Sequence, residues 1–495
     1  MMTGGSLGIR SGSYGSLDKQ LQNGVSPIAR TKPSSKTFKE KETLIHWICK
    51  LTGRKKVGML LLCIISVAVF VCVLYVGKGE DQESNDVRNE NRIRTSLSLS
   101  PSYFLGYTLP PGHACNTFRL PPPPADKKRT GPRPCPVCYL PMEEAVALMP
   151  KLPSFSPIIK NLSYISGGSE FGGNPTLKQR NDSYDIKESM NVHCGFVKGS
   201  KPGNGTGFDM DDDDLLEMEQ CRGVVVASAI FGDFDIIQQP KNISEYSKKT
   251  VCFYMFVDEK TQAGLKTKYD NKKIGVWRII LVRNLPYTDS RRNGKIPKLL
   301  LHRLFPNVRF SLWIDGKLEL VADPYQILER FLWRRNASFA ISRHYKRFDV
   351  FHEAEANKVA GKYDNASIDF QVEFYKNEGL TPYSDAKLSI TSDVPEGCVI
   401  IREHIPISNL FTCLWFNEVD RFTSRDQLSF STVRDKIAAN TNWSVSMFLD
   451  CERRNFVVQK YHKEVLARLA PPPPPPPYSA NDHLRKFLPR RRRDR

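Results

Sequence analysis

The stretch Arg291 to Glu319, RRNGKIPKLLLHRLFPNVRFSLWIDGKLE, decides the fold. A basic loop leads into an apolar run that predicts a helix over 296–304. A strand over 309–314 follows and ends abruptly at Asp315. In an open α/β sheet, a carboxylate at the carboxyl end of a buried strand faces the ligand crevice. The stretch therefore predicts an α/β domain with Asp315 at the edge of a binding site.

Asp315 in such a place can hold a divalent cation through its oxygens, and the cation can hold a diphosphate. Four basic side chains are close enough in sequence to bring positive charge to the same phosphates: Arg291, Arg292, Lys295 and Lys298. Asp-Gly is also a common turn pair, so Asp315 and Gly316 could simply form a turn. These residues alone leave both the phosphate site and the turn open.

The region around this stretch, residues 221–466, is the predicted catalytic domain. Short Val/Ile/Phe runs alternate there with helical stretches, which is typical of an α/β domain. Further strands are predicted over 224–230, 251–257, 277–282 and 337–342, and a further helix over 324–333.

Residues 57–76, VGMLLLCIISVAVFVCVLYV, carry no charge over twenty positions. A helix of that length spans about 30 Å, the thickness of a bilayer's hydrocarbon core. A buried core helix is the alternative, although such helices rarely run uncharged for so long. Because no Ala-x-Ala site follows, the segment predicts an uncleaved transmembrane signal-anchor.

The flanking charge sets the orientation of this anchor. Residues 1–56 hold eleven Lys/Arg and three Asp/Glu, a net charge of +8, whereas acidic residues follow the anchor. Residues 1–56 are therefore a predicted disordered cytosolic tail, and the rest of the chain is lumenal. Its predicted parts are a stem at 77–110, a Cys/Pro- and sequon-containing region at 111–220, the catalytic domain, and a polyproline and basic tail at 467–495.

The whole chain carries a net charge of +19. Without the cytosolic tail at +8 and the residues after Tyr478 at +5, the folded part keeps about +6. This mild bias suits nucleoside diphosphates or acidic glycans. Nucleic acid is excluded as a partner, because the lumen offers none.

Sequons and cysteines agree with a lumenal domain. Asn-x-Ser/Thr sequons, which predict glycosylation, occur at Asn161, Asn181, Asn204, Asn242, Asn336, Asn365 and Asn442. Nine cysteines follow the anchor, so the oxidising lumen predicts disulfides with at least one cysteine left over. A zinc site formed by His113 and the cysteines at 115, 135 and 138 is the less favoured alternative.

The stretch 414–431, LWFNEVDRFTSRDQLSFS, carries the candidate catalytic carboxylates Glu418 and Asp426. A carboxylate among aromatic residues could bind acceptor hydroxyls or act as a general base. Surface charges on a helix explain both residues equally well. His462 is a candidate metal ligand, although a lone histidine is more often structural.

Six segments resemble a plant family once classed as a domain of unknown function and now described as hexosyltransferases related to seed-mucilage synthesis. They are VVVASAIFGDFDII at 224–237, CFYMFVDE at 252–259, RRNGKIPKLLLHRLFP at 291–306, LWIDGKLELVADPYQILERFLWR at 312–334, SDVPEGCVIIREHIP at 392–406 and LFTCLWFNEVDRFTSRDQLSFSTVRDKI at 410–437. They cover about half of the chain and most of the predicted catalytic domain.

The resemblance implies a GT-A-like fold, a Rossmann-type mixed sheet flanked by helices, which binds a nucleotide sugar, usually with manganese. Asp233 in the loop after the first strand would then meet the nucleotide. The Asp-x-Asp metal motif would fall on Asp315, but its partner position is Lys317. Either Asp315 works with another metal ligand, such as His462, or Lys317 replaces some of the metal's charge.

The segment Arg425-Asp426-Gln427 resembles the acceptor-side carboxylate segment of GT-A enzymes. This assigns Asp426 the acceptor or base role, with Glu418 as a second candidate.

The predicted function is that of a Golgi type II membrane glycosyltransferase, which moves a hexose from a nucleotide sugar to a pectin- or xylan-type cell-wall polysaccharide. The family also contains a protein described as an alkaline ceramidase involved in turgor control, so ceramide hydrolysis is the alternative. That hydrolysis usually needs a multi-ligand zinc site or a Ser/Cys nucleophile. A non-catalytic scaffold, in complexes with other Golgi transferases, is the third possibility.

Overall fold

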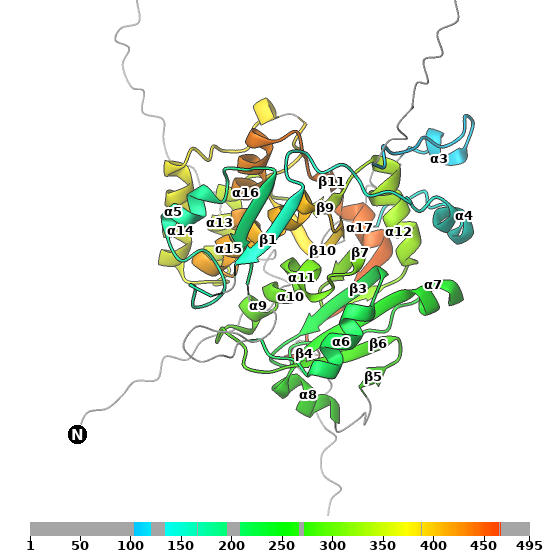
Figure 1. Ribbon diagram of the computed structural model, residues 1–495, viewed down its shortest axis with the longest axis horizontal. Coiled ribbons are helices and arrows are strands. Elements are labelled where there is room, and N and C mark those ends of the chain that lie inside the picture. Colours follow the sequence, from blue (N-terminus) through cyan, green and yellow to red (C-terminus); the bar gives the residue numbers. More distant parts are fainter. Residues whose placement is uncertain are drawn as a thin grey trace, which may run out of the picture. The chain divides into compact units, whose positions relative to one another are not determined.

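The computed structural model describes residues 103–119, 134–165, 167–195, 208–266, 272–387, 389–464 and 466 (Figure 1). The predicted cytosolic tail, the anchor at 57–76, most of the stem, Asn204 and the C-terminal tail at 467–495 lie outside these residues. Within the described ranges, no helix is long and apolar enough to cross a bilayer.

A mixed sheet of eight strands forms the centre of the catalytic domain, in the order β11-β9-β10-β7-β3-β4-β6-β5 (Figure 1). The strands are β3 (Gly223–Ile230), β4 (Val251–Asp258), β5 (Lys273–Ile274), β6 (Trp277–Val282), β7 (Val308–Ile314), β9 (Phe339–Arg343), β10 (Pro395–Glu403) and β11 (Ser446–Phe448). Strands β7, β3, β4 and β6 are parallel, and β10 runs antiparallel between β7 and β9. The predicted mixed α/β fold is therefore confirmed.

Helices cover both faces of this sheet. On one face, α10 (Lys295–Leu299), α11 (Leu301–Leu304), α15 (Pro406–Arg421) and α16 (Asp426–Asn440) share a core with Val225 and Ala227 of β3. On the other face, α12 (Pro324–Phe331) and α17 (Asp450–Phe456) share a core with Val224 and Val226. Because successive side chains of a strand point to opposite faces, a strand buried on both sides reads as a continuous apolar run.

The remaining elements are shorter or peripheral. They are α6 (Asp212–Gln220), α7 (Glu245–Thr250), α8 (Glu259–Lys266), α9 (Ser290–Asn293), α13 (Val350–Val359), α14 (Asn365–Asn377), the 3-10 helices η1 (Trp333–Arg335) and η2 (Asp385–Lys387), and the antiparallel pair β8 (Leu318–Leu320) and β12 (Val457–Gln459).

The predicted strands and helices match the structure, except that both predicted helices are divided. The helix expected over 324–333 ends at Phe331, and residues 333–335 form the 3-10 helix η1. The helix expected over 296–304 bends at Leu300, where ψ is 24°, and so divides into α10 and α11. The hydrogen bonds of Leu300 to Ile296 and of Leu304 to Leu300 are kept across the bend.

The region before the large sheet forms a small layer with its own two-stranded sheet. β1 (Asn161–Ile165) and β2 (Ser189–His193) form a two-stranded parallel sheet, and α5 (Leu177–Asp182) lies beside it (Figure 1). The short helices α3 (Ala114–Thr117) and α4 (Met142–Ala147) precede it.

Four disulfides tie these parts together. They join Cys115 to Cys138, Cys135 to Cys451, Cys194 to Cys413, and Cys221 to Cys252, and Cys398 is left free and buried. The predicted disulfides and the leftover cysteine are thus confirmed. The alternative zinc site beside His113 is not supported, because its three cysteines are bonded to sulfur.

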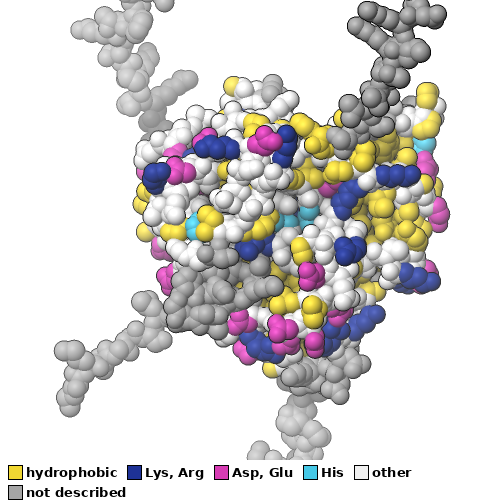
Figure 2. Space-filling model, viewed as in Figure 1, with side chains coloured by type: hydrophobic (Ala, Val, Ile, Leu, Met, Phe, Trp, Pro, Cys, Tyr) yellow, Lys and Arg dark blue, Asp and Glu magenta, His cyan; other side chains and the backbone are white. Residues whose placement is uncertain are grey.

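Basic and acidic side chains are interspersed on the face drawn in Figure 2. The excess positive charge of the folded part is therefore not gathered into one broad patch on that face.

Two neighbouring histidines lie at α11 and at the end of β10: the buried His302 on α11 and the half-buried His404 after β10. Nε2 of His404 is 2.8 Å from Oγ of Ser311, and the rings of His404 and His302 are 6.2 Å apart. Nδ1 of each ring has no hydrogen-bond partner among the described residues. Burial, reinforced by the positive charge of Arg402, lowers the pKa of both histidines well below the usual value.

We expect the free energy of unfolding to fall as the pH drops below about 6.5, the pKa of an unfolded histidine. Both rings are neutral in the folded chain and take up protons on unfolding. Each ring therefore lowers the free energy of unfolding by at most about 1.4 kcal/mol for every pH unit below that pKa. Urea unfolding of the purified chain between about pH 5.5 and about pH 7.5 measures this slope. His404→Gln keeps a polar group near Ser311. The slope of its free energy of unfolding against pH should correspond to about one proton fewer than in the wild type. Equal slopes in the two proteins would contradict the expectation.

Candidate functional site

Asp315 lies in a turn at the carboxyl end of β7. Its Oδ1 accepts a hydrogen bond from Nε1 of Trp313 (2.9 Å), and its backbone N–H donates to the carbonyl of Cys398 on β10 (2.9 Å). The backbone of Leu318 closes the turn by donating to the carbonyl of Asp315. Asp315 is therefore both a turn residue and a carboxylate at the sheet edge, so the two alternatives are compatible.

Gly316 brings this turn against the end of β3. A Cβ at position 316 would lie 2.6 Å from Cγ1 of Ile230 and 2.8 Å from the carbonyl oxygen of Ala229, closer than real Cβ contacts allow. Only glycine fits there without a backbone shift. Because β3 and β7 are parallel neighbours, their carboxyl ends and the loops that follow them meet at one edge of the sheet.

Lys295 and Lys298 from α10 converge on Asp426 at the start of α16. Their Nζ atoms lie 2.9 Å and 2.6 Å from the same carboxylate oxygen of Asp426. The side chains of Lys298 and Asp426 are 4% and 5% exposed, so this is a buried ion triad. Gly397 of β10 makes room for it, since a Cβ at Gly397 would lie 3.0 Å from Nζ of Lys298.

The charges in this triad shift one another's pKa. Although burial opposes it, the two ammonium groups hold the pKa of Asp426 well below its usual range. Burial lowers the pKa of Lys295 to about 8, whereas the charges of Asp426 and Asp315 raise the pKa of Lys298 above its usual value against the effect of burial. Asp315 acts on both lysines, so the structure brings these four predicted site residues together.

A second group of cations surrounds Lys362, which lies between α13 and α14. Burial, followed by the charges of Arg425, Arg291 and Lys317, lowers the pKa of Lys362 to about 8. Two of these three neighbours, Arg291 and Lys317, were predicted site residues. Lys362 itself was not, because it is more than forty positions away from each of them in the sequence.

The loop after β3 contacts the segment that directly follows β12. Asp233, whose φ is 60°, forms an ion pair with Lys463. Oδ1 of Asp235 lies 2.6 Å from Nδ1 of His462. The backbone N–H of Lys460 donates to the carbonyl of Lys317 (2.9 Å). The segment 460–463 therefore connects the Asp315 turn, through Lys460, with the loop that carries Asp233, through His462 and Lys463.

Glu418 lies in a different setting. It is 1% exposed and accepts hydrogen bonds from Arg180 (2.6 Å), from the hydroxyl of Tyr184 (3.2 Å) and from the hydroxyl of Tyr375 (2.8 Å). Arg180 also pairs with Glu378 at 2.6 Å. All of these partners are internal, so this carboxylate joins α5, α14 and α15. The arrangement does not support the acceptor or base role expected for Glu418.

The sequon asparagines that the structure describes are all exposed: Asn161, Asn181, Asn242, Asn336, Asn365 and Asn442. Their exposure is what attachment of a glycan requires.

Comparison with known proteins adds the family. Residues 159–462 match the family model described as "TOD1/MUCI70, glycosyltransferase-like domain". The chain belongs to this family. The match spans more than half of the chain and contains Asp315, the lysine–aspartate triad and His462. The predicted family resemblance is thereby confirmed.

Two Arabidopsis thaliana relatives differ in the reaction that their names give. The probable hexosyltransferase MUCI70 is 66% identical over 95% of this chain and 89% of its own length. The alkaline ceramidase TOD1 is 40% identical over 58% of this chain and 63% of its own length. Both are members of the family to which this chain belongs.

Among solved structures, apo mouse xyloside xylosyltransferase 1 aligns with 46% of this chain and 85% of its own chain. The sequence identity is 8% and the TM-score is 0.26, which is too loose a likeness to carry an argument.

Proposed function

We propose that the chain is a Golgi type II membrane glycosyltransferase that moves a hexose from a nucleotide sugar to a pectin- or xylan-type cell-wall polysaccharide. The convergence of Lys295, Lys298 and Asp315 beside the carboxyl ends of β7 and β3 carries this proposal, because open α/β sheets bind ligands there. The glycosyltransferase-like family domain and the relative named probable hexosyltransferase support the same class of reaction.

The proposed fold is GT-A-like. Four parallel strands, β6-β4-β3-β7, form a Rossmann-type half-sheet, and the antiparallel strand β10 extends it. In this arrangement the nucleotide would lie over the loop after β3, where Asp233 is found, and its diphosphate would lie toward the turn at Asp315.

The reaction breaks the bond between the anomeric carbon of the hexose and an oxygen of the diphosphate, and negative charge develops on that leaving group. Fixed cations at this place stabilise the transition state more than the ground state. The structure offers two sources of such charge. One is Lys295, and the other is the group around Lys362, formed by Arg291, Lys317 and Arg425.

Asp426 is assigned a positioning role in this account. A carboxylate whose pKa is held well below its usual range is a weak base, so the double ion pair argues against the base role that was expected for it. Its carboxylate instead holds the ammonium groups of Lys295 and Lys298 side by side.

Manganese, if bound, would be held by the carboxylate of Asp315 and the ring of His462 in this proposal. The ring of His462 is oriented through Nδ1 by Asp235, as carboxylates commonly orient histidines that bind a metal through the other nitrogen. A bound ion would add Lewis-acid charge to the diphosphate. Lys317 stands where a second carboxylate ligand would be expected, so its charge would supply part of the same stabilisation.

The topology and location are also part of the proposal. Four disulfides suit an oxidising compartment, and six exposed sequon asparagines suit contact with the glycosylation machinery. The anchor predicted at 57–76 would hold this domain at the lumenal face of the Golgi membrane.

Binding of the donor should weaken above about pH 8, where Lys295 loses its proton in the free protein. Its pKa lies below the ordinary lysine value, so the ammonium form that attracts a diphosphate is complete only below that pH. The dissociation constant should rise by up to about tenfold per pH unit above it. Calorimetric titration with a nucleoside diphosphate between about pH 6 and about pH 9.5 measures the effect.

Lys295→Arg is the matched variant for this measurement, since a guanidinium stays charged over the whole range. Its affinity should stay flat where that of the wild type falls. If both proteins lose affinity in parallel, another group sets the pH dependence and Lys295 does not contact the diphosphate.

A panel of nucleotide sugars, titrated with and without manganese into the purified chain, tests the proposed function. Saturable binding of one donor, followed by hexose transfer to pectin or xylan oligosaccharides, is the expected result. Release of a sphingoid base from ceramide without nucleotide binding would favour the reaction named for the 40% identical relative. Stable complexes with other Golgi transferases, without either activity, would favour a scaffold.

A further inference from the structure

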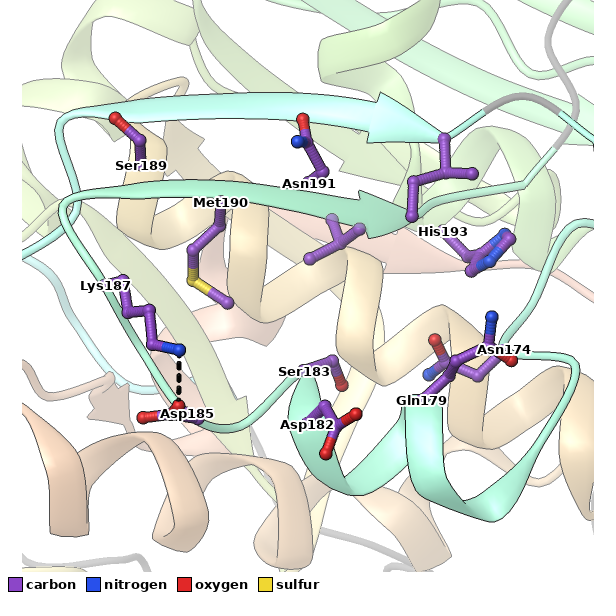
Figure 3. A pocket seen from close by; sticks show the side chains of 12 residues that line it. Asn174, Gln179, Asp182, Ser183, Asp185, Lys187, Ser189, Met190, Asn191 and His193 are labelled. Atoms are coloured by element: carbon purple, nitrogen blue, oxygen red, sulfur yellow. Dashed lines mark ion pairs between the residues drawn. The ribbon is translucent and has the colours of Figure 1, made fainter.

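A cavity of about 240 Å³ lies between β2 and α5, in the layer that precedes the catalytic sheet (Figure 3). Met190 and Val192 of β2 supply an apolar side. Asn174, Gln179 and His193 gather at one end, and Ser183 lies at the α5 side. The volume is below the range of about 300–1,000 Å³ of drug-sized ligands, and so it suits a single small ring.

The charges at this cavity are already paired. Asp185 lies 2.8 Å from Lys187, and Asp182 lies 2.6 Å from Lys178. The amide side chains of Asn174 and Gln179 are neutral. A phosphate or a carboxylate would find no unbalanced positive charge here, whereas a neutral ligand with several hydroxyl groups would find both donors and acceptors.

His193 gives the cavity a polar group without a protein partner. Its side chain lines the cavity, the residue is 4% exposed, and Nε2 has no hydrogen-bond partner among the described residues. Burial lowers the pKa of His193, so the ring stays neutral near neutral pH. Buried polar atoms are normally hydrogen-bonded. Nε2 has almost no accessible surface of its own, so a hydroxyl group of a ligand would satisfy it after a small shift of the surrounding side chains.

We infer that this cavity is a binding subsite for one neutral sugar residue of a glycan. The combination of an apolar side, amide side chains and a neutral imidazole matches a sugar ring, which has an apolar face and hydroxyls at its edge. The inference rests on the proposed function in one respect: the glycan would be the polysaccharide acceptor, held at a distance from the transferred hexose.

The cavity is fixed to the element that leads to the lysine–aspartate triad. Nδ2 of Asn417 on α15 donates to the carbonyl of His193 (2.9 Å), and Arg421 donates to the carbonyl of Asn174 (2.8 Å). The short loop after α15 then leads to Asp426, the first residue of α16. A polymer bound at the cavity would therefore contact the helix that directly precedes the carboxylate of the triad.

Neutral oligosaccharides of xylose, galactose and glucose are the probes, and saturation-transfer NMR on the full chain is the measurement. We expect binding of at least one of them, weakened roughly tenfold by Asn174→Ala and by Gln179→Ala, because each change removes a hydrogen-bonding group. Lys160→Gln, an exposed change just before β1 and outside the cavity, is the matched control and should bind as the wild type does.

Donor binding is measured on the same proteins to separate the two proposals. Oligosaccharide binding lost in the cavity variants, with nucleotide binding unchanged, supports the subsite. Oligosaccharide binding that is absent, or that survives both cavity changes, overturns it. If the wild type binds no nucleotide, the proposed function is overturned. The subsite is then judged from the oligosaccharide titrations alone.

The sugar could also come from the chain itself, because the sequon Asn181-Asp182-Ser183 lies on α5 beside the cavity. Asn181→Gln distinguishes the two sources. Unchanged affinity for the free oligosaccharide supports the acceptor as occupant. A marked gain in affinity would show that an attached glycan competes for the cavity, which overturns the acceptor assignment while keeping the sugar site.

Discussion

Asp315→Asn should lower hexose transfer by about 100- to 1,000-fold while leaving the fold intact. The change removes the charge that faces Lys295 and Lys298 and that would hold the ion on the donor's diphosphate. An asparagine oxygen can still accept the hydrogen bond from Trp313, so the turn should persist. Transfer rates and urea unfolding of the same preparations measure the two effects.

Asp369→Asn is the control for this substitution. Asp369 is a surface carboxylate on α14 whose side chain is 62% exposed and pairs with Lys358. Its loss should change neither transfer nor stability by a measurable amount. If Asp315→Asn were as active as this control, Asp315 would be a turn residue only and the proposed donor site would be wrong.

Asp426→Asn should destabilise the fold by about 3–5 kcal/mol, because it removes the carboxylate that both ammonium groups contact directly. Both Nζ atoms contact the same oxygen of Asp426, at 2.9 Å and 2.6 Å, whereas Asp315 acts on the two lysines only through its charge. The urea unfolding midpoint of the purified variant measures the loss. Transfer should fall as well, because Lys295 is no longer held.

Removing one of the two lysines should restore part of this stability. Asp426→Asn combined with Lys298→Met leaves a single buried ammonium group, so the double variant should be more stable than Asp426→Asn alone. Asp435→Asn, on the same helix but 35% exposed, serves as the control. If the Asp426→Asn variant has normal stability but no transfer activity, Asp426 binds the acceptor or acts as the base, and the positioning role is wrong.

Much of the fold could be predicted from local patterns. The Val/Ile/Phe runs of β3, β4, β6, β7 and β9 are long enough and apolar enough to be recognised as buried strands. Asp315 could be placed at the sheet edge because it directly follows the predicted strand over 309–314. Lys295 and Lys298 could be placed near it because they begin the preceding helix.

The parts that could not be predicted depend on contacts between distant segments. Asp426 and Glu418 are only eight positions apart in an apparently uniform stretch, yet one pairs with two lysines of α10 and the other with Arg180 of α5. Nothing in their local sequence distinguishes these partners. Lys362 was missed for the same reason, because its cationic neighbours come from three other segments.

The most direct measurement of the central claim is a structure of the chain with a nucleoside diphosphate bound. The account predicts phosphate oxygens within hydrogen-bonding distance of Lys295 and beside Asp315, with the nucleoside over the loop that carries Asp233. A diphosphate bound elsewhere, with the Asp315 turn and the lysine–aspartate triad untouched, would contradict it.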